Sequence, residues 1–137
     1  MSELLSPASL NTAGILLLSI IAVEFGGYYM LKIVRGRAAV TEFQRNFARA
    51  GHAHAGVLVS LALVCQPFVD AADMSGFAGG VARSGVAFAA ILMSAGFFFS
   101  SMNKGATKPN GFIVLLYAGT LSLALGVGFL GFGLVTA

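Results

Sequence analysis

Residues 11–33 read NTAGILLLSIIAVEFGGYYMLKI, an apolar run that contains one acid, Glu24, and reaches a basic residue only at Lys32. A helix of about 20 such residues crosses the roughly 30 Å of hydrocarbon in a bilayer. The runs do not alternate with period two, so we expect membrane helices and not membrane strands. Three more runs have the length and composition of a span: 51–69, 84–102 and 111–135.

The composition of the chain supports this interpretation. Of its 137 residues, 58% are hydrophobic and only 9% are charged. That leaves more apolar surface than one soluble core of this size can bury, so lipid must cover the remainder. We therefore expect one all-α domain over residues 1–137, an antiparallel bundle of four transmembrane helices in a multi-pass integral membrane protein.

The basic residues give the bundle an orientation. Seven of the eight lysines and arginines border the first and third connections, whereas the second connection offers Arg83 against Asp70 and Asp73. Lysine and arginine accumulate in cytoplasmic loops. We therefore expect the first and third connections in the cytoplasm and both termini on the outer side of a bacterial-type plasma membrane.

The same cationic residues predict contacts at the membrane surface. A net charge of +3 could indicate nucleic acid binding, but these residues border spans and form no free solvated face. The bilayer, and not nucleic acid, is the expected partner. We expect the following residues to contact lipid headgroups or a cytoplasmic partner: Arg35, Arg37, Arg45, Arg49, Lys104 and Lys108.

The first two connections predict different structures. In Val34–Ala50, Phe43 and Phe47 are four residues apart, which is helical spacing. We expect this stretch to be a cytoplasmic extension of the second helix. The second connection, 70–83, contains three glycines and is expected to be flexible.

Small residues are frequent in all four runs. There is little hydrophobic force between helices in lipid, so small side chains that allow close packing should mark the contact faces. The fourth run carries glycines on more than one face, which is more than a four-helix monomer needs. We therefore expect a homo-oligomer or a larger membrane complex. These glycines are Gly119, Gly126, Gly128, Gly131 and Gly133.

Glu24 is the one acid inside an apolar run. It lies nine residues before Ile33, about 14 Å from the inner end of the span and close to the middle of the bilayer. An ionised carboxylate there costs about 3 kcal/mol, so we expect it to be protonated or paired. Tyr28 lies one turn later on the same face and can hydrogen-bond the carboxyl group. The alternative is a protonated glutamic acid that only links two helices.

Two histidines follow at the start of the second run, in the sequence His52-Ala53-His54. They are about 200° apart on a helix, so both cannot reach one ion from a regular backbone. His54 is expected about 7 Å deep, within reach of Glu24. A carboxylate beside an imidazole can pass a proton near neutral pH. Alternatively, both rings cap or hydrogen-bond groups near the lipid headgroups.

The same spacing leaves a metal or haem site open. On a distorted helix, His52 and His54 could bind a transition metal. Zinc usually takes three or four ligands, so Glu24, Cys65 or a second subunit would have to complete the set. Haem would take one axial histidine from this pair and a second ligand from elsewhere.

The layout of the first run resembles that of small multidrug resistance transporters. The shared features are four short spans and an embedded glutamate, Glu24, followed by Gly27 and Met30-Leu31-Lys32. The resemblance implies an acid that binds protons and cationic substrates. The chain departs from that family in having no tryptophan, in its His-Ala-His run and in its long basic first connection. Its span count and basic start of helix two are also similar to membrane glutathione-utilising enzymes, but their second-helix acid is missing here.

Three functions are consistent with these residues. The first is a non-enzymatic subunit or scaffold of a membrane assembly, with a buried polar centre of Glu24, Tyr28, His52 and His54. The second is a small proton-coupled or cation transporter that uses Glu24 with His54 or His52. The third is a metal- or haem-binding membrane protein. The deep residues contain no set of nucleophile, base and orienting group, so we do not expect an enzyme.

Overall fold

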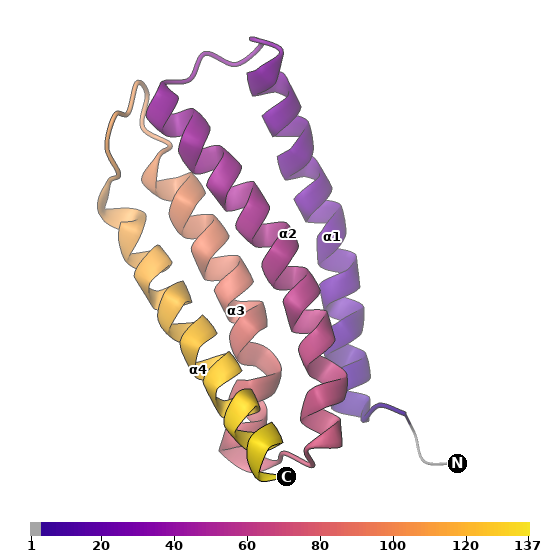
Figure 1. The fold of residues 1–137 in the computed structure, drawn as a ribbon. Coiled ribbons are helices and arrows are strands. Elements are labelled where there is room, and N and C mark those ends of the chain that lie inside the picture. Colours follow the sequence, from indigo (N-terminus) through magenta and orange to yellow (C-terminus); the bar gives the residue numbers. More distant parts are fainter. Residues whose placement is uncertain (1–3) are drawn as a thin grey trace.

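The computed structural model describes residues 4–137, and its regular structure is helical (Figure 1). Each of its four long helices, η1 being counted with α4, is long and apolar enough to cross a membrane. This confirms the predicted number and type of spans. The elements are α1 (Pro7–Val34), α2 (Glu42–Ala71), α3 (Gly76–Ser100), a 3-10 turn η1 (Gly111–Ile113) and α4 (Val114–Thr136).

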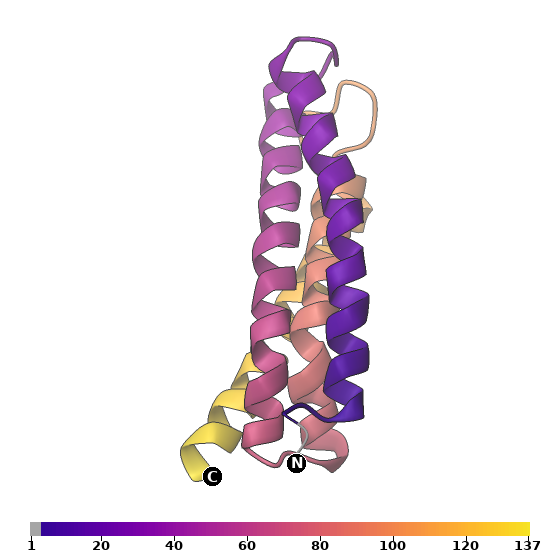
Figure 2. The same ribbon diagram turned by 90° about the vertical axis from the view of Figure 1, so that its right-hand side faces the viewer.

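The helices run up and down between the two ends of the molecule and form an open row (Figure 1). α3 packs between α2 and α4, and α1 packs mainly against α2 with a smaller contact to α3. Helices α1 and α4 do not touch each other. In the view turned by 90°, α1 lies in front and α4 emerges behind the other helices (Figure 2). The row therefore has two open edges, α1 and α4.

The interface between α3 and α4 is the closest helix contact. A Cβ atom built on Gly85 would lie 2.7 Å from the Cα atom of Gly126, and one on Gly96 would lie 2.6 Å from the backbone nitrogen of Leu116. Only glycine permits this approach, which confirms that these glycines mark a contact face. The excess glycines on α4 have no such role inside the chain, because nothing lies within 4 Å of the corresponding positions at Gly128 and Gly131.

Helix α1 is held much more loosely than α3. In its most apolar stretch 11% of the residues are buried within the chain, against 39% for α3. Leu16 is the one residue of α1 in the main hydrophobic cluster, which is otherwise built from α2, α3 and α4 and includes the fully buried Ala62, Val86 and Ala89. The core therefore lies away from α1.

The predicted extension of the second helix is confirmed for residues 42–50 and is wrong for the rest of Val34–Ala50, because Val34 ends α1 and residues 35–41 form a connection. α2 begins at Glu42, and Thr41 and Gln44 form a capping box at its start. The rings of Phe43 and Phe47 contact each other at a tilt of 42°, with their centroids 4.3 Å apart. The centroid of the Phe47 ring also lies 5.4 Å from that of Phe97 on α3. Phe47 thus attaches the extension to α3, and Phe43 packs beside it.

The predicted flexible second connection is wrong in its length. α3 begins at Gly76, so Gly79 and Gly80 are helical and only residues 72–75 join α2 to α3. A Cβ atom on Gly79 would lie 2.5 Å from the carbonyl oxygen of Met74. The glycine lets the chain fold back onto the first turn of the helix, so packing outweighs its low helix propensity.

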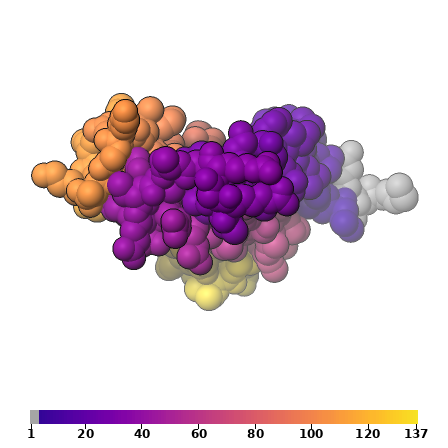
Figure 3. Space-filling model, turned by 90° about the horizontal axis from the view of Figure 1, so that it is seen from above, coloured from indigo at the N-terminus to yellow at the C-terminus, as the bar shows by residue number. Residues whose placement is uncertain are grey.

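The two longer connections, 35–41 and 101–110, lie at the same end of the molecule. Figure 3 looks onto this end, where the purple start of α2 and the orange α3–α4 connection are both at the surface. The side-chain amide of Gln44 donates to the carbonyl oxygens of Ser101 at 2.9 Å and Asn103 at 3.0 Å. This end also carries the basic residues of the two connections, and we call it the basic end.

Candidate functional site

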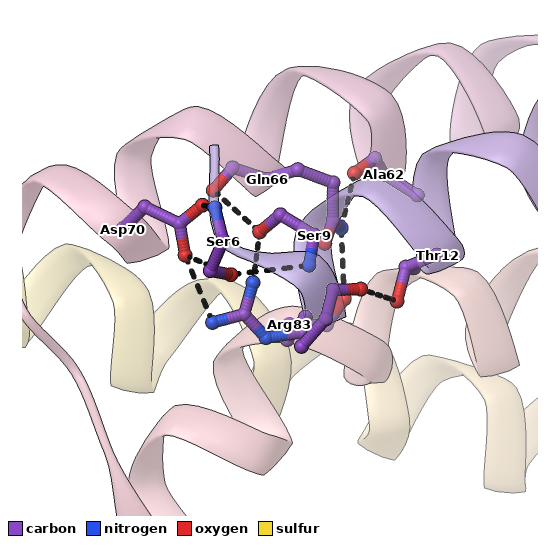
Figure 4. Close-up of polar contacts among 8 residues, drawn as sticks. Ser6, Ser9, Thr12, Ala62, Gln66, Asp70 and Arg83 are labelled. Atoms are coloured by element: carbon purple, nitrogen blue, oxygen red, sulfur yellow. Dashed lines mark hydrogen bonds and ion pairs between the residues drawn. The ribbon is translucent and has the colours of Figure 1, made fainter. Parts of the chain in front are cut away.

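A polar cluster at the opposite end connects α1, α2 and α3 (Figure 4). We call it the Asp70 clamp; it contains Ser6, Ser9, Gln66, Asp70 and Arg83. The carboxylate of Asp70 accepts from Arg83 Nη2 at 3.0 Å, from the Ser6 backbone nitrogen at 2.8 Å and from Ser6 Oγ at 2.9 Å. Asp70 therefore holds the start of α1 and the first half of α3 against the end of α2.

The remaining members of the clamp are linked by further hydrogen bonds, although the side-chain oxygen of the buried Gln66 has no partner within residues 4–137. Arg83 Nη1 donates to Ser9 Oγ, and Ser9 Oγ donates to the carbonyl oxygen of Gln66 at 3.3 Å. The Gln66 amide nitrogen donates to the carbonyl oxygens of Ala62 at 2.8 Å and Arg83 at 3.0 Å. Because each charge meets an opposite charge or a hydrogen-bonding group, the clamp is a structural tie and leaves no free charge for chemistry.

One feature of the sequence, besides the charges around the connections, indicates this clamp. Gln66 is a polar residue inside an apolar run, and Asp70 lies four residues later on the same helix face. Asp70 and Arg83 border the second connection in the sequence, and their positions alone do not show that they form an ion pair. That Ser6 and Ser9 complete the set depends on contacts between segments more than 50 residues apart.

The two histidines point to different helices, as their helical spacing predicts. A Cβ atom on Gly26 would lie 3.1 Å from Nδ1 of His52, so this ring packs over the backbone of α1. The ring of His54 packs against Phe97 of α3 with centroids 4.9 Å apart. His54 Nδ1 lies 2.8 Å from the carbonyl oxygen of Ala50; since a carbonyl only accepts, Nδ1 is the donor.

Glu24 does not join the histidines. The structure places it on the exposed side of α1, and the only salt bridge within residues 4–137 is that of Asp70 and Arg83. Tyr28 is also exposed, and its ring lies 4.9 Å below the Nζ atom of Lys32. The predicted buried centre of Glu24, Tyr28, His52 and His54 is therefore not formed within the chain.

The reason is the rotation of α1 about its axis. The face that meets α2 contains Gly26 and Gly27, over which His52 packs. Glu24 is turned about 200° from Gly26 and so faces away from the neighbouring helix. We call the exposed stripe that contains Glu24 the outward face of α1; its residues are Leu17, Ile21, Glu24 and Tyr28.

Within residues 4–137, the fold does not bring together a set of ligands that would support the metal or haem hypothesis. No group of three or more His, Cys, Asp or Glu residues that could hold a metal ion occurs within residues 4–137. His52 and His54 diverge, and Cys65 is buried deeper along α2. A site on either histidine would need ligands from outside the chain.

The predicted surface cations remain available to other molecules. Arg35, Arg37, Arg45 and Arg49 are exposed at the end of α1 and the start of α2. Lys104 and Lys108 are exposed on the connection from α3 to α4. In the part of the chain that the structure describes, none of the six forms a salt bridge.

A lateral groove of about 410 Å³ lies between α1 and α3, with Ala55 and Val59 of α2 among its lining residues. The hydroxyl groups of Thr12 and Ser19 on its wall donate to backbone carbonyls of their own helix, at 2.9 and 2.7 Å. The groove is lined largely by apolar atoms and lies beside stretches of α1 and α3 that are apolar enough to cross a membrane.

Comparison of the chain with protein-family models, with curated proteins and with solved structures found no match.

Proposed function

We propose that this protein is a non-enzymatic membrane subunit that joins a larger helical assembly through the outward face of α1. The observation that carries the proposal is the position of Glu24, exposed on the most loosely packed of the four helices. It lies ten residues before Val34, the last residue of α1, which is about 15 Å along the helix.

An exposed carboxyl group at that depth would be unfavourable in lipid. Placing an acid at the centre of a transmembrane helix costs about 3 kcal/mol on insertion scales. Hydrogen bonds between membrane helices contribute about 1–2 kcal/mol each in model peptides. A neighbouring protein that offers one or two such bonds to Glu24 would offset most of the cost, whereas lipid tails offer none.

The internal packing of the chain supports the same function. The charges of Asp70 and Arg83 are used to tie three helices together. Between this clamp and the histidines lies an apolar core that includes Leu58, Val59 and Ala62. The polar groups are thus separated by hydrocarbon, which favours a structural subunit over a single-chain transport path.

The proposal includes an orientation. Lysines and arginines collect on the cytoplasmic side of membrane proteins. We assign the basic end to the cytoplasm of a bacterial-type plasma membrane, with Arg35, Arg45 and Lys104 close to anionic headgroups. The Asp70 clamp and both chain ends would then lie at the outer surface.

The test is photo-crosslinking in the native membrane. The photoreactive residue p-benzoylphenylalanine replaces Ile21, which is 60% exposed and lies one turn before Glu24. We expect a crosslinked protein band. The matched control replaces Val57, which is 66% exposed on α2 and should yield mainly lipid adducts. Lipid adducts alone at both positions would contradict the proposal.

A further inference from the structure

We propose that the partner of the outward face of α1 is α4 of a second copy of this chain, so that copies associate edge to edge. The inference rests on the proposed function, because it identifies the neighbour that shields Glu24. Four observations support it: the topology of the row, and three matches between the two open edges.

The topology places compatible helices at the two edges. Successive helices run in opposite directions, and α1 and α4 lie at opposite edges without touching (Figure 1). Within one membrane, α4 of a neighbouring copy would therefore run antiparallel to α1. The contact would continue the alternation that already exists inside the chain.

The first match is polar. At the end of the molecule that carries the Asp70 clamp, Glu24 lies 17 residues from the first residue of α1, and Thr120 lies 16 residues from the last residue of α4. At the basic end, Glu24 lies ten residues from the last residue of α1, and Thr120 lies nine residues from the start of η1. Counted from either end, the two side chains reach about the same depth. Both are exposed on their own helices. The acid of α1 thus lies level with the hydroxyl group of Thr120.

The second match is the chemistry of the donors and acceptors. The hydroxyl of Thr120 donates to the carbonyl oxygen of Leu116 at 2.9 Å, which leaves its oxygen free to accept from a protonated Glu24. Tyr117 lies one turn nearer the basic end, and its side chain is 66% exposed. Its phenol can donate to the carboxyl oxygen of Glu24. Together they can satisfy the acid in a dry interface.

The third match is one of size. On the exposed side of α4 that carries Thr120, the side chains nearer the Asp70 clamp are small, at Ala124 and Gly128. A hollow of about 290 Å³ is lined by both residues. On α1 the residues that lie level with them are Ile21 and Leu17, both well exposed. Large side chains on one edge therefore meet small ones on the other, which is how membrane helices come close.

The two surfaces differ, so the contact is heterologous and a third copy can bind the second as the second binds the first. This gives a ring or a longer row and not a two-fold dimer. It also accounts for Gly128 and Gly131 of α4, where an added Cβ atom would meet nothing within 4 Å inside the chain.

The experiment uses cysteine pairs in native membranes. One chain carries Ile21→Cys and a second carries Ala124→Cys, while the native Cys65 stays in place because it is buried. Mild oxidation should yield a mixed dimer that neither variant forms alone. A chain carrying both substitutions should yield a ladder of trimers and larger species. Glu24→Leu should lower the crosslinked fraction about tenfold, through the loss of one to two hydrogen bonds.

The control pairs Ile21→Cys with Val57→Cys, which lies on α2 and should not crosslink. Homodimers of the Ile21→Cys chain alone, equal crosslinking in the control pair, or no crosslinking would each overturn the inference. If photo-crosslinking from position 21 captures a different protein, this inference fails while the proposed function stands. If it captures only lipid, both fail.

Discussion

The Asp70 clamp and the outward face of α1 each place a carboxyl group on a helix that is long and apolar enough to cross a membrane, yet only the first has its partners in the same chain. Asp70 meets Arg83 and Ser6 at hydrogen-bond distances, whereas Glu24 is exposed and forms no salt bridge within residues 4–137. The difference separates two roles for polar groups in lipid. The clamp stabilises the fold, and we propose that Glu24 meets a neighbouring protein.

The largest expected effect comes from breaking the clamp on one side. Arg83→Leu leaves the Asp70 carboxylate without its cation, and removing one member of a buried pair costs about 3 kcal/mol or more. Because both side chains keep 16% of their surface exposed, we expect the free energy of unfolding to fall by about 3 kcal/mol, the lower end of that range. Unfolding in mixed detergent micelles measures this loss. The double variant Arg83→Leu/Asp70→Leu should lose less than either single variant. Additive losses would show that the two charges are not coupled.

A smaller effect separates the glycines that pack inside the chain from those left open. In Gly126→Ala the new Cβ atom would lie 3.0 Å from the Cα atom of Gly85, so we expect the free energy of unfolding to fall by about 1–3 kcal/mol. Gly128→Ala meets nothing within 4 Å and should cause no loss in a detergent that keeps the chain monomeric. Equal losses in thermal unfolding would contradict the assigned α3–α4 interface.

The smallest expected effect tests how His52 packs on α1. Alanine gains helix propensity over glycine by about 1 kcal/mol. At Gly27 the new Cβ atom would make an ordinary contact of 3.4 Å with the His52 ring, but at Gly26 it would lie at 3.1 Å. We therefore expect Gly27→Ala to be more stable than Gly26→Ala, by less than about 1 kcal/mol. The midpoints of thermal unfolding compare the two variants, and the reverse order would place His52 elsewhere.

The spans could be predicted from the sequence because membrane helices depend on local composition. So could the divergence of His52 and His54, which follows from the 100° turn per residue. The start of α3 could not, since the sequence does not show that Gly79 packs closely against the backbone of Met74.

The direction of Glu24 could not be predicted, because α1 is apolar on all sides and its sequence does not show which face meets α2. A soluble helix reveals its buried face by its polar residues. In lipid this signal is lost, so the rotation of α1 depends on contacts with other helices, such as that between Gly26 and His52. The full Asp70 clamp escapes prediction for a related reason: its members come from three helices.

The most direct test of the role of Glu24 is the mass of the assembly released from native lipid, measured by native mass spectrometry. For the wild-type chain we predict a species heavier than one chain. Glu24→Leu should shift it to the single-chain mass, while Glu42→Leu, which changes the exposed glutamate at the start of α2, should not. A wild-type protein that leaves the membrane as a single chain without any partner would contradict the claim that Glu24 faces another protein.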